Sequence, residues 1–225
     1  LTSLITPYTD MDENLPGKPT ISAPTIINDG GFFYVELNWA NPNQTIKGDD
    51  MPAQGDDYSV NIYRDGYPTP FITLTGESAE PGAATVSFTD VDADYGWHLY
   101  TIRYANSKGE GVPARMRVYL GPDVPGPVTD LTLTAEGSTT AKLTWNAPTA
   151  GSNGGWFDAG SLNYNIMRYP GAVKVATGYT ETSFEEELEV ELGYYYVVTP
   201  FSSGGEGVSA ESNSVIIGNP TTIPW

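Results

Sequence analysis

The sequence predicts an all-β protein made of two consecutive β-sandwich domains. Its 225 residues suffice for two domains of about a hundred residues each. The composition combines turn formers with strand formers, with 25 glycines, 18 prolines and 15 tyrosines. The strongest observation is a repeat, because the peptide NSKGEGVPA at 106–114 returns as SSGGEGVSA at 202–210. Two copies of one domain explain such a repeat most simply.

Other landmarks recur in the same order along the chain. They lie 106, 104 and 96 positions apart and are Trp39 and Trp145, Arg64 and Arg168, and Tyr100 and Tyr196. The spacing shrinks because the first copy has extra residues around LTGESAEPGAAT, which has the composition of a loop. Each copy is therefore expected to be a domain with its own core rather than one unit of a solenoid.

Alternation of apolar and polar residues predicts strands in both copies. In FYVELNW the predicted buried side chains are Phe33, Val35, Leu37 and Trp39, and in TAKLTW they are Ala141, Leu143 and Trp145. In the next segments the predicted buried side chains are Tyr58, Val60 and Ile62, followed by Tyr100, Ile102 and Tyr104. Asp65-Gly66 predicts a hairpin turn. The repeated Gly-Glu-Gly is expected to be the turn between the last two strands, since glycine tolerates positive φ.

These landmarks resemble a tandem pair of fibronectin type III domains of a bacterial, Bacteroidetes-like secreted or cell-surface protein. The resemblance rests on Trp39 and Trp145, on the Tyr-x-Ile/Val strands at Tyr100 and Tyr196, and on the Gly-Glu-Gly turns. It implies two consecutive seven-stranded immunoglobulin-like sandwiches without the disulfide of antibody domains. It also implies that Tyr100 and Tyr196 are tyrosine-corner residues, whose hydroxyls bond backbone a few residues upstream.

The expected boundaries follow from the repeat. Residues 1–18 are expected to be a linker from a preceding module, 19–121 the first domain, 122–218 the second, and 219–225 a linker to a following module. Three prolines at the junction, Pro122, Pro125 and Pro127, predict a semi-rigid connection. Because the chain starts at Leu1, it is interpreted as a piece of a longer protein.

Charge limits the partners. The chain has 28 acidic and 10 basic residues, so its formal net charge of −18 disfavours nucleic acid and an anionic membrane surface. No run approaches the ~20 apolar residues that span a bilayer, so direct membrane insertion is not expected. Expected partners are other domains of the same longer chain and an extracellular protein or glycan. The chain has no cysteine, so disulfides and thiolate metal sites are absent. No cofactor is expected.

The sequence contains little that predicts catalysis. His98 is the only histidine, and a Ser-His-Asp system would have to use it. It lies in a predicted strand without an evident counterpart in the second copy, so a structural role is expected. The resemblance implies a non-catalytic spacer and interaction module, in cell adhesion or glycan-associated binding, outside the cell or on its surface. The alternative is an accessory segment of a secreted carbohydrate-active enzyme whose catalytic domain lies outside this chain.

Two candidate binding sites remain. Asp90, Asp92 and Asp94 alternate as at the start of a calcium loop, but the glycine and the closing glutamate of such a loop are missing, which favours a solvated turn. Trp156 and Phe157 lie in the Gly-rich segment GSNGGWFDAGSLN. Exposed, they would stack on sugar rings or anchor a protein, and folded back they would cover the edge of the sandwich.

Overall fold

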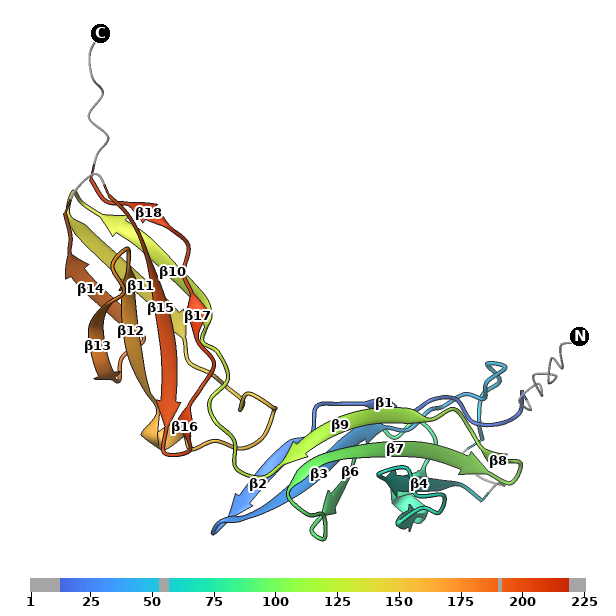
Figure 1. Cartoon of the computed structure of the whole chain (residues 1–225). Coiled ribbons are helices and arrows are strands. Elements are labelled where there is room, and N and C mark those ends of the chain that lie inside the picture. The colour runs from blue at the N-terminus through green and yellow to red at the C-terminus, as the bar shows by residue number, and fades with distance from the viewer. Residues whose placement is uncertain (1–12, 53–56, 190–191, 219–225) are drawn as a thin grey trace, which may run out of the picture. The chain divides into compact units, whose positions relative to one another are not determined.

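Regular structure in the protein is almost entirely antiparallel strand (Figure 1). The computed structural model describes residues 13–52, 57–189 and 192–218. Within these ranges the helical segments are two short 3₁₀ helices, η1 (Gly76–Ala79) and η2 (Ala159–Ser161). No helix of the described part is long and apolar enough to cross a bilayer. Of the predicted linkers at 1–18 and 219–225, residues 1–12 and 219–225 lie outside the described residues.

The chain divides into two compact units between Leu120 and Gly121. The first unit, blue to green in Figure 1, is built from two antiparallel sheets. One sheet has the order β1-β3-β2 with β6 also paired to β3, and the other has the order β5-β4-β7-β8 with β9 also paired to β7. The strands are β1 (Thr20–Ile21), β2 (Thr25–Asp29), β3 (Phe32–Ala40), β4 (Ser59–Arg64), β5 (Ile72–Leu74), β6 (Val86–Asp90), β7 (Gly96–Asn106), β8 (Gly109–Glu110) and β9 (Ala114–Leu120).

The second unit, yellow to red in Figure 1, repeats this plan. One sheet has the order β10-β11-β14, and in the other β13-β12-β15 continues into β16, β17 and β18, which all pair with β15. The strands are β10 (Thr129–Glu136), β11 (Thr140–Asn146), β12 (Asn163–Tyr169), β13 (Val173–Tyr179), β14 (Ser183–Glu187), β15 (Gly193–Ser202), β16 (Gly205–Glu206), β17 (Ala210–Glu211) and β18 (Val215–Ile216).

Several short strands are pieces of one longer strand. β1 and β2 pair with successive stretches of the same edge of β3, and β8 and β9 do so on β7. On β15 the successive pieces are β16, β17 and β18. Counted in this way, the described part of each unit has seven strands, three in one sheet and four in the other. The prediction of two consecutive seven-stranded fibronectin type III-like sandwiches is confirmed.

Alternation along the strands explains the core. In β3 every second side chain is buried, and Val35 and Leu37 are completely inaccessible. The first core also contains Trp39, Val60, Ile62, Tyr100, Ile102, Tyr104 and Leu120. The second contains Leu133, Leu143, Trp145, Tyr164, Ile166, Tyr196 and Val198. Each large aromatic side chain removes much apolar surface from water, which stabilises a sandwich that has no disulfide.

The extra residues of the first copy form the η1 segment, which is held from both sheets. The Asn41 amide donates to two backbone carbonyls of this segment at 3.0 and 2.9 Å, and the Tyr104 hydroxyl donates to a third at 2.5 Å. At the matching positions the second unit has Ala147 and Pro200, which carry no such donors. The insertion and its two anchors therefore occur together in one copy and are absent together from the other.

In the first unit, the two glycines of the repeated Gly-Glu-Gly peptide are needed for different reasons. Gly109 has a φ of 133°, which other residues rarely adopt, so the predicted conformational reason applies to it. Gly111 is required by a close approach instead, because a Cβ there would lie 1.9 Å from the carbonyl oxygen of Pro16. That same carbonyl accepts a hydrogen bond from the Val112 N–H at 3.3 Å.

The second unit repeats these contacts. Gly205 has a φ of 123°, and a Cβ on Gly207 would lie 2.3 Å from the carbonyl oxygen of Pro125. The Val208 N–H donates to Pro125 at 3.2 Å. In both units the repeated peptide therefore holds a Pro-Gly segment that precedes the first strand. The contact between the Gly-Glu-Gly peptide and the Pro-Gly segment explains why each unit contains a copy of the peptide.

Further backbone hydrogen bonds join residues 13–18 to the first unit. Gly17 N donates to the Gln44 carbonyl at 2.8 Å, and the Leu15 carbonyl accepts from Ile46 N at 2.8 Å. Residues 13–18, predicted above as part of a linker, are thus hydrogen-bonded to the first unit. The Pro16-Gly17 pair lies against the repeated Gly-Glu-Gly peptide, as Pro125-Gly126 does in the second unit.

Candidate functional site

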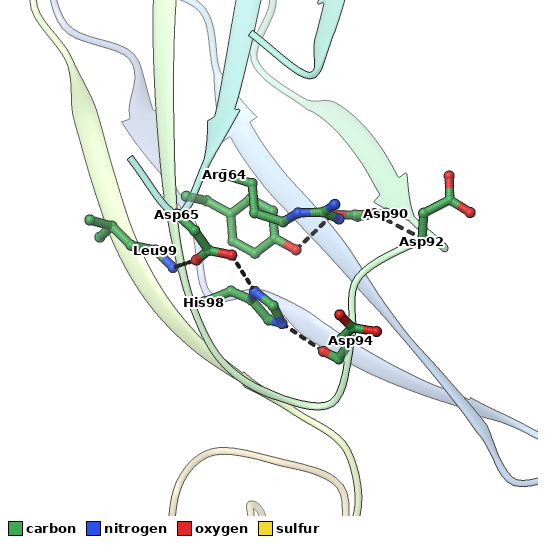
Figure 2. A network of polar contacts seen from close by, with 8 residues as sticks. Arg64, Asp65, Asp90, Asp92, Asp94, His98 and Leu99 are labelled. Carbon is green, nitrogen blue, oxygen red and sulfur yellow. Dashed lines mark hydrogen bonds and ion pairs between the residues drawn. The ribbon is translucent and has the colours of Figure 1, made fainter. Parts of the chain in front are cut away.

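Asp90, the first of the three candidate calcium ligands, is an internal ion-pair partner. It ends β6 and is 2% exposed. Its Oδ2 accepts from Arg64 Nη1 at 2.7 Å and from the Tyr100 hydroxyl at 2.8 Å, while Oδ1 accepts from Asp92 N at 3.1 Å (Figure 2). Both carboxylate oxygens are therefore used within the fold.

This arrangement keeps Tyr100 neutral. Burial and the hydrogen bond to the Asp90 carboxylate raise the pKa of the Tyr100 hydroxyl well above its ordinary value. The phenol therefore remains a hydrogen-bond donor at alkaline pH, where an ordinary tyrosine ionises. The contact is a structural bridge between three strands, with Arg64 on β4, Asp90 on β6 and Tyr100 on β7.

The second unit contains the same bridge with a longer acid. Arg168 Nη1 lies 2.9 Å from Glu186 Oε2, and the Tyr196 hydroxyl donates to Glu186 Oε1 at 2.5 Å. Burial and the Glu186 carboxylate raise the pKa of Tyr196 as well. We call the two sets, Arg64–Asp90–Tyr100 and Arg168–Glu186–Tyr196, the Arg-acid-Tyr bridges.

The tyrosine-corner assignment of Tyr100 and Tyr196 is wrong. Their hydroxyls bond carboxylates on the opposite sheet rather than the backbone upstream. In the second unit the corner contact is made two residues earlier, where the Tyr194 hydroxyl donates to the Glu189 carbonyl at 3.4 Å. Both side chains face the sandwich interior from one strand, so their two-residue spacing hid which of them bonds the backbone.

His98 is the counterpart of Tyr194 in the first unit, 96 positions earlier, although no counterpart was evident in the sequence. Its Nε2 lies 2.6 Å from the Asp94 carbonyl oxygen and its Nδ1 lies 2.8 Å from Asp65 Oδ2 (Figure 2). Both ring nitrogens thus contact acceptors within the fold, and neither is directed at a ligand. A general base needs a nitrogen that is free to accept a proton, and this geometry provides none.

Asp65 completes this network at the hairpin turn. It accepts from Leu99 N at 2.9 Å in addition to the contact with His98. Burial alone would raise the pKa of Asp65, but the hydrogen bonds from Leu99 N and His98 hold it below its ordinary value. Asp65 and Gly66 have φ angles of 55° and 75°, so the turn is of the type predicted for Asp-Gly.

The three candidate calcium ligands do not converge. Asp90 is buried and bonded within the fold, whereas Asp92 and Asp94 are exposed (Figure 2). Among the described residues there is no group of three histidine or acidic side chains placed to hold a metal ion. The alternating carboxylates diverge because β6 ends at Asp90 and the chain turns toward β7.

The candidate loop with Trp156 and Phe157 is folded onto the start of the second unit. Phe157 is only 8% exposed, so its ring is not presented to a ligand, and Trp156 is half-buried. Asp123 N donates to the Trp156 carbonyl at 2.7 Å, and Trp156 N donates to the Gly121 carbonyl at 3.2 Å. Backbone contacts thus fix the aromatic pair against residues 121–123.

Asp123 organises this loop. It is 8% exposed, and its carboxylate accepts from Asn153 N at 2.7 Å, Ser152 Oγ at 3.0 Å and Gly155 N at 3.1 Å. Burial opposes ionisation, yet these hydrogen bonds lower the pKa of Asp123. The carboxylate therefore stays ionised and holds the Gly-rich loop in one conformation.

An exposed site lies elsewhere, on the outer face of the first unit's four-stranded sheet. A depression of about 510 Å³ there is lined by residues that include Tyr63, Tyr67, Thr101, Arg103, Glu110 and Arg115. We call it the Tyr67 depression. Glu110 accepts from the Tyr63 hydroxyl and from Asn61 Nδ2, and lies 3.5 Å from Arg103 Nε. Burial and the Glu110 carboxylate raise the pKa of Tyr63 to about 12.

The same outer face carries further aromatic and arginine side chains along β7 and β9. Trp97 is 48% exposed, its ring lies 5.4 Å from that of Tyr119, and the Arg117 guanidinium lies 4.6 Å from the Trp97 centroid. Sequence reasoning missed this face. The signal was available in ARMRVYL, where alternation points Arg115, Arg117 and Tyr119 away from the core.

Comparison with known proteins finds similarity among solved structures. No protein-family model matches the chain, and no curated protein matches it. Among solved structures, the FN1-FN3 domains of chicken CNTN1 share 18% sequence identity with it over 92% of this chain and 70% of that one, with a TM-score of 0.35. The fold assignment therefore rests on the strands and their pairing in each unit.

Proposed function

We propose that this chain is a non-catalytic spacer and interaction segment of a secreted or cell-surface protein. One contrast carries the proposal. Some side chains are of types that can act in catalysis, namely His98 and the acids of the two Arg-acid-Tyr bridges. Their polar atoms are already hydrogen-bonded within the fold. Aromatic rings and arginines are instead displayed on an outer sheet face.

The composition of that face supports an interaction function. Tryptophan, tyrosine and arginine are the residues that contribute most to binding energy at protein surfaces. Exposed Trp97 and Tyr67 add apolar surface to this face, and exposed apolar surface is a feature of interaction sites. The resemblance to tandem fibronectin type III domains supports the extracellular setting and a function in adhesion or glycan-associated binding.

The test measures turnover and binding on the same purified protein. Oligosaccharides and peptides are incubated with it and analysed for cleavage products, and the same molecules are immobilised for binding. We expect binding without product formation. Cleavage that disappears when one carboxylate is neutralised, as in Glu110→Gln, would overturn the non-catalytic assignment.

A further inference from the structure

We propose that the Tyr67 depression binds a carboxylate-bearing sugar and is the subsite through which the first unit recognises an acidic glycan. The inference rests on the proposed interaction function and names its ligand class. It depends on the charge of this face, on an exposed ring beside the depression, and on the hydrogen-bonding groups that line it.

Charge is the first argument. The chain has five arginines and a net charge of −18, yet Arg103, Arg115 and Arg117 all lie on this one face. Within the described part of the chain, Arg115 and Arg117 have no ion pair. Glu110, the one carboxylate among the described residues that line the depression, is already bonded to Tyr63, Asn61 and Arg103. Because distant charges are screened beyond about 8 Å in physiological salt, this local excess of positive charge favours an anion.

An exposed ring on an anchored turn also favours a sugar ligand. Tyr67 is 69% exposed and follows the Asp65-Gly66 turn, where its N–H donates to the Arg64 carbonyl at 3.2 Å. Asp65 anchors that turn through Leu99 N and His98. The network in Figure 2 therefore holds in place the turn that carries Tyr67. A ring on a fixed turn provides an apolar stacking surface at little entropic cost on binding.

The residues around the depression also supply hydrogen-bonding groups. Arg115 provides planar donors that match a carboxylate, which accepts two parallel hydrogen bonds from a guanidinium. Glu110 provides acceptor capacity and Thr101 a hydroxyl, and sugar hydroxyls both donate and accept. A volume of about 510 Å³ lies within the range of small-ligand sites.

These features favour a glycan over an acidic peptide. Extended peptides commonly bind to sheets by adding a strand at an edge, through main-chain hydrogen bonds. Here the donors and the ring come from side chains on the face of the sheet, from β4, β7, β9 and the turn after β4. A compact depression of this kind suits one or two sugar rings.

The experiment is calorimetric titration of the purified chain with three acidic oligosaccharides, each beside a neutral counterpart. The pairs are oligogalacturonate and its methyl ester, a hyaluronan oligosaccharide and its methyl ester, and sialyllactose and lactose. We expect at least one acidic member to bind about tenfold or more tightly than its neutral counterpart, since one charge-assisted contact is worth about that factor.

Single-residue variants test whether the acidic oligosaccharide binds at the Tyr67 depression. Arg115→Gln and Tyr67→Ala should each weaken binding about fivefold or more, because one removes the guanidinium and the other the stacking ring. Lys174→Gln is the matched control: it removes one positive charge from an exposed position of the second unit and should change affinity less than about twofold. Both Arg115 and Tyr67 are exposed, so thermal melting should confirm unchanged folding.

Several results would overturn the site. These are no binding of any acidic oligosaccharide, equal binding of the neutral counterparts, or binding that Arg115→Gln leaves unchanged. Tighter binding of a hexaglutamate peptide with the same dependence on Arg115 would assign the depression to an acidic protein segment instead. If other oligosaccharides or peptides bind without cleavage, this site is wrong while the proposed function stands. If nothing binds and nothing is cleaved, the interaction function fails as well and the spacer function remains, whereas cleavage would overturn the non-catalytic assignment.

Discussion

Asp90 and Tyr100 meet in the core of the first unit, where the Tyr100 hydroxyl donates to Asp90 Oδ2 at 2.8 Å. Glu186 and Tyr196 make the corresponding contact in the second unit at 2.5 Å. An arginine joins each pair from a neighbouring strand. Two copies with largely different loops and surfaces thus keep one polar contact between their sheets.

Replacing the tyrosine by phenylalanine measures how much this hydrogen bond contributes to the free energy of unfolding. Tyr100→Phe should lower the free energy of unfolding of the first unit by about 2 kcal/mol, because a hydrogen bond to a buried charge is lost. Tyr196→Phe should do the same in the second unit. Urea unfolding measures both. Tyr67→Phe, which removes an exposed hydroxyl, is the matched control and should leave stability within about 0.5 kcal/mol. An equal effect of Tyr67→Phe and Tyr100→Phe would count against the bridge.

Removing the acid should cost more. Asp90→Asn leaves the Arg64 guanidinium without its carboxylate in a partly buried position, and we expect a loss of about 3 kcal/mol in the free energy of unfolding of the first unit. Asp92→Asn is the control, because it makes the same change at an exposed neighbouring carboxylate. Urea unfolding compares the two variants. Stability unchanged by Asp90→Asn would contradict an internal role for this carboxylate.

The bridges predict loss of stability at alkaline pH. The folded-state pKa of Tyr100 and Tyr196 lies above the ordinary value of 10.0. The stabilisation is therefore complete below pH 10 and declines as pH rises above it, because the unfolded chain ionises first. Urea unfolding at pH 9 and pH 11 measures this decline. The double variant Tyr100→Phe, Tyr196→Phe should show a smaller decline; an identical one would remove these tyrosines as its cause.

Asp123 predicts the opposite dependence at acid pH. Its folded-state pKa lies below the ordinary 3.8, so its stabilisation is present above that value and is lost as pH falls below it. Asp123→Asn should release the loop at neutral pH. We expect amide hydrogen exchange at Asn153 and Gly155, which donate to this carboxylate, to accelerate about tenfold or more. Unchanged protection of these amides would exclude Asp123 as the organiser of the loop.

The second glycine of each repeated peptide should not tolerate a methyl group. Gly111→Ala would place Cβ 1.9 Å from the Pro16 carbonyl oxygen, and Gly207→Ala would place it 2.3 Å from that of Pro125. Each should destabilise its unit by about 1 to 3 kcal/mol, as overpacking does. Gly193→Ala is the control, since its nearest neighbour would be 3.9 Å away. Differential scanning calorimetry compares the three, and an equally small effect of all three would contradict the close approach.

The strands were predictable because alternation has a period of two. Trp39 and Val35 fall on the buried face by counting alone, and the Asp65-Gly66 turn follows from the positive φ angles that such a turn needs. The duplicated architecture was predictable because landmarks recur in order. These signals are local, so they can be read without knowing which strands pair.

The polar bridge was not predictable in the same way. Alternation places Tyr100 on the inner face but does not give its register, and Arg64 lies opposite Tyr100 only through the pairing of β4 with β7. The fate of Phe157 likewise depends on Asp123, which lies about 30 positions earlier and hydrogen-bonds the preceding loop. A Gly-rich loop with two aromatics looks exposed in sequence, because nothing local indicates the carboxylate that holds it.

Contact between the first unit and its ligand through the Tyr67 depression is tested most directly by nuclear magnetic resonance. The measurement is the pattern of amide chemical-shift changes in the labelled chain when the acidic oligosaccharides are added. We predict that the changes centre on Tyr63, Tyr67, Thr101, Arg103 and Arg115, which surround the depression. Changes centred on the loop around Trp156, or none with any of the three acidic oligosaccharides, would contradict it.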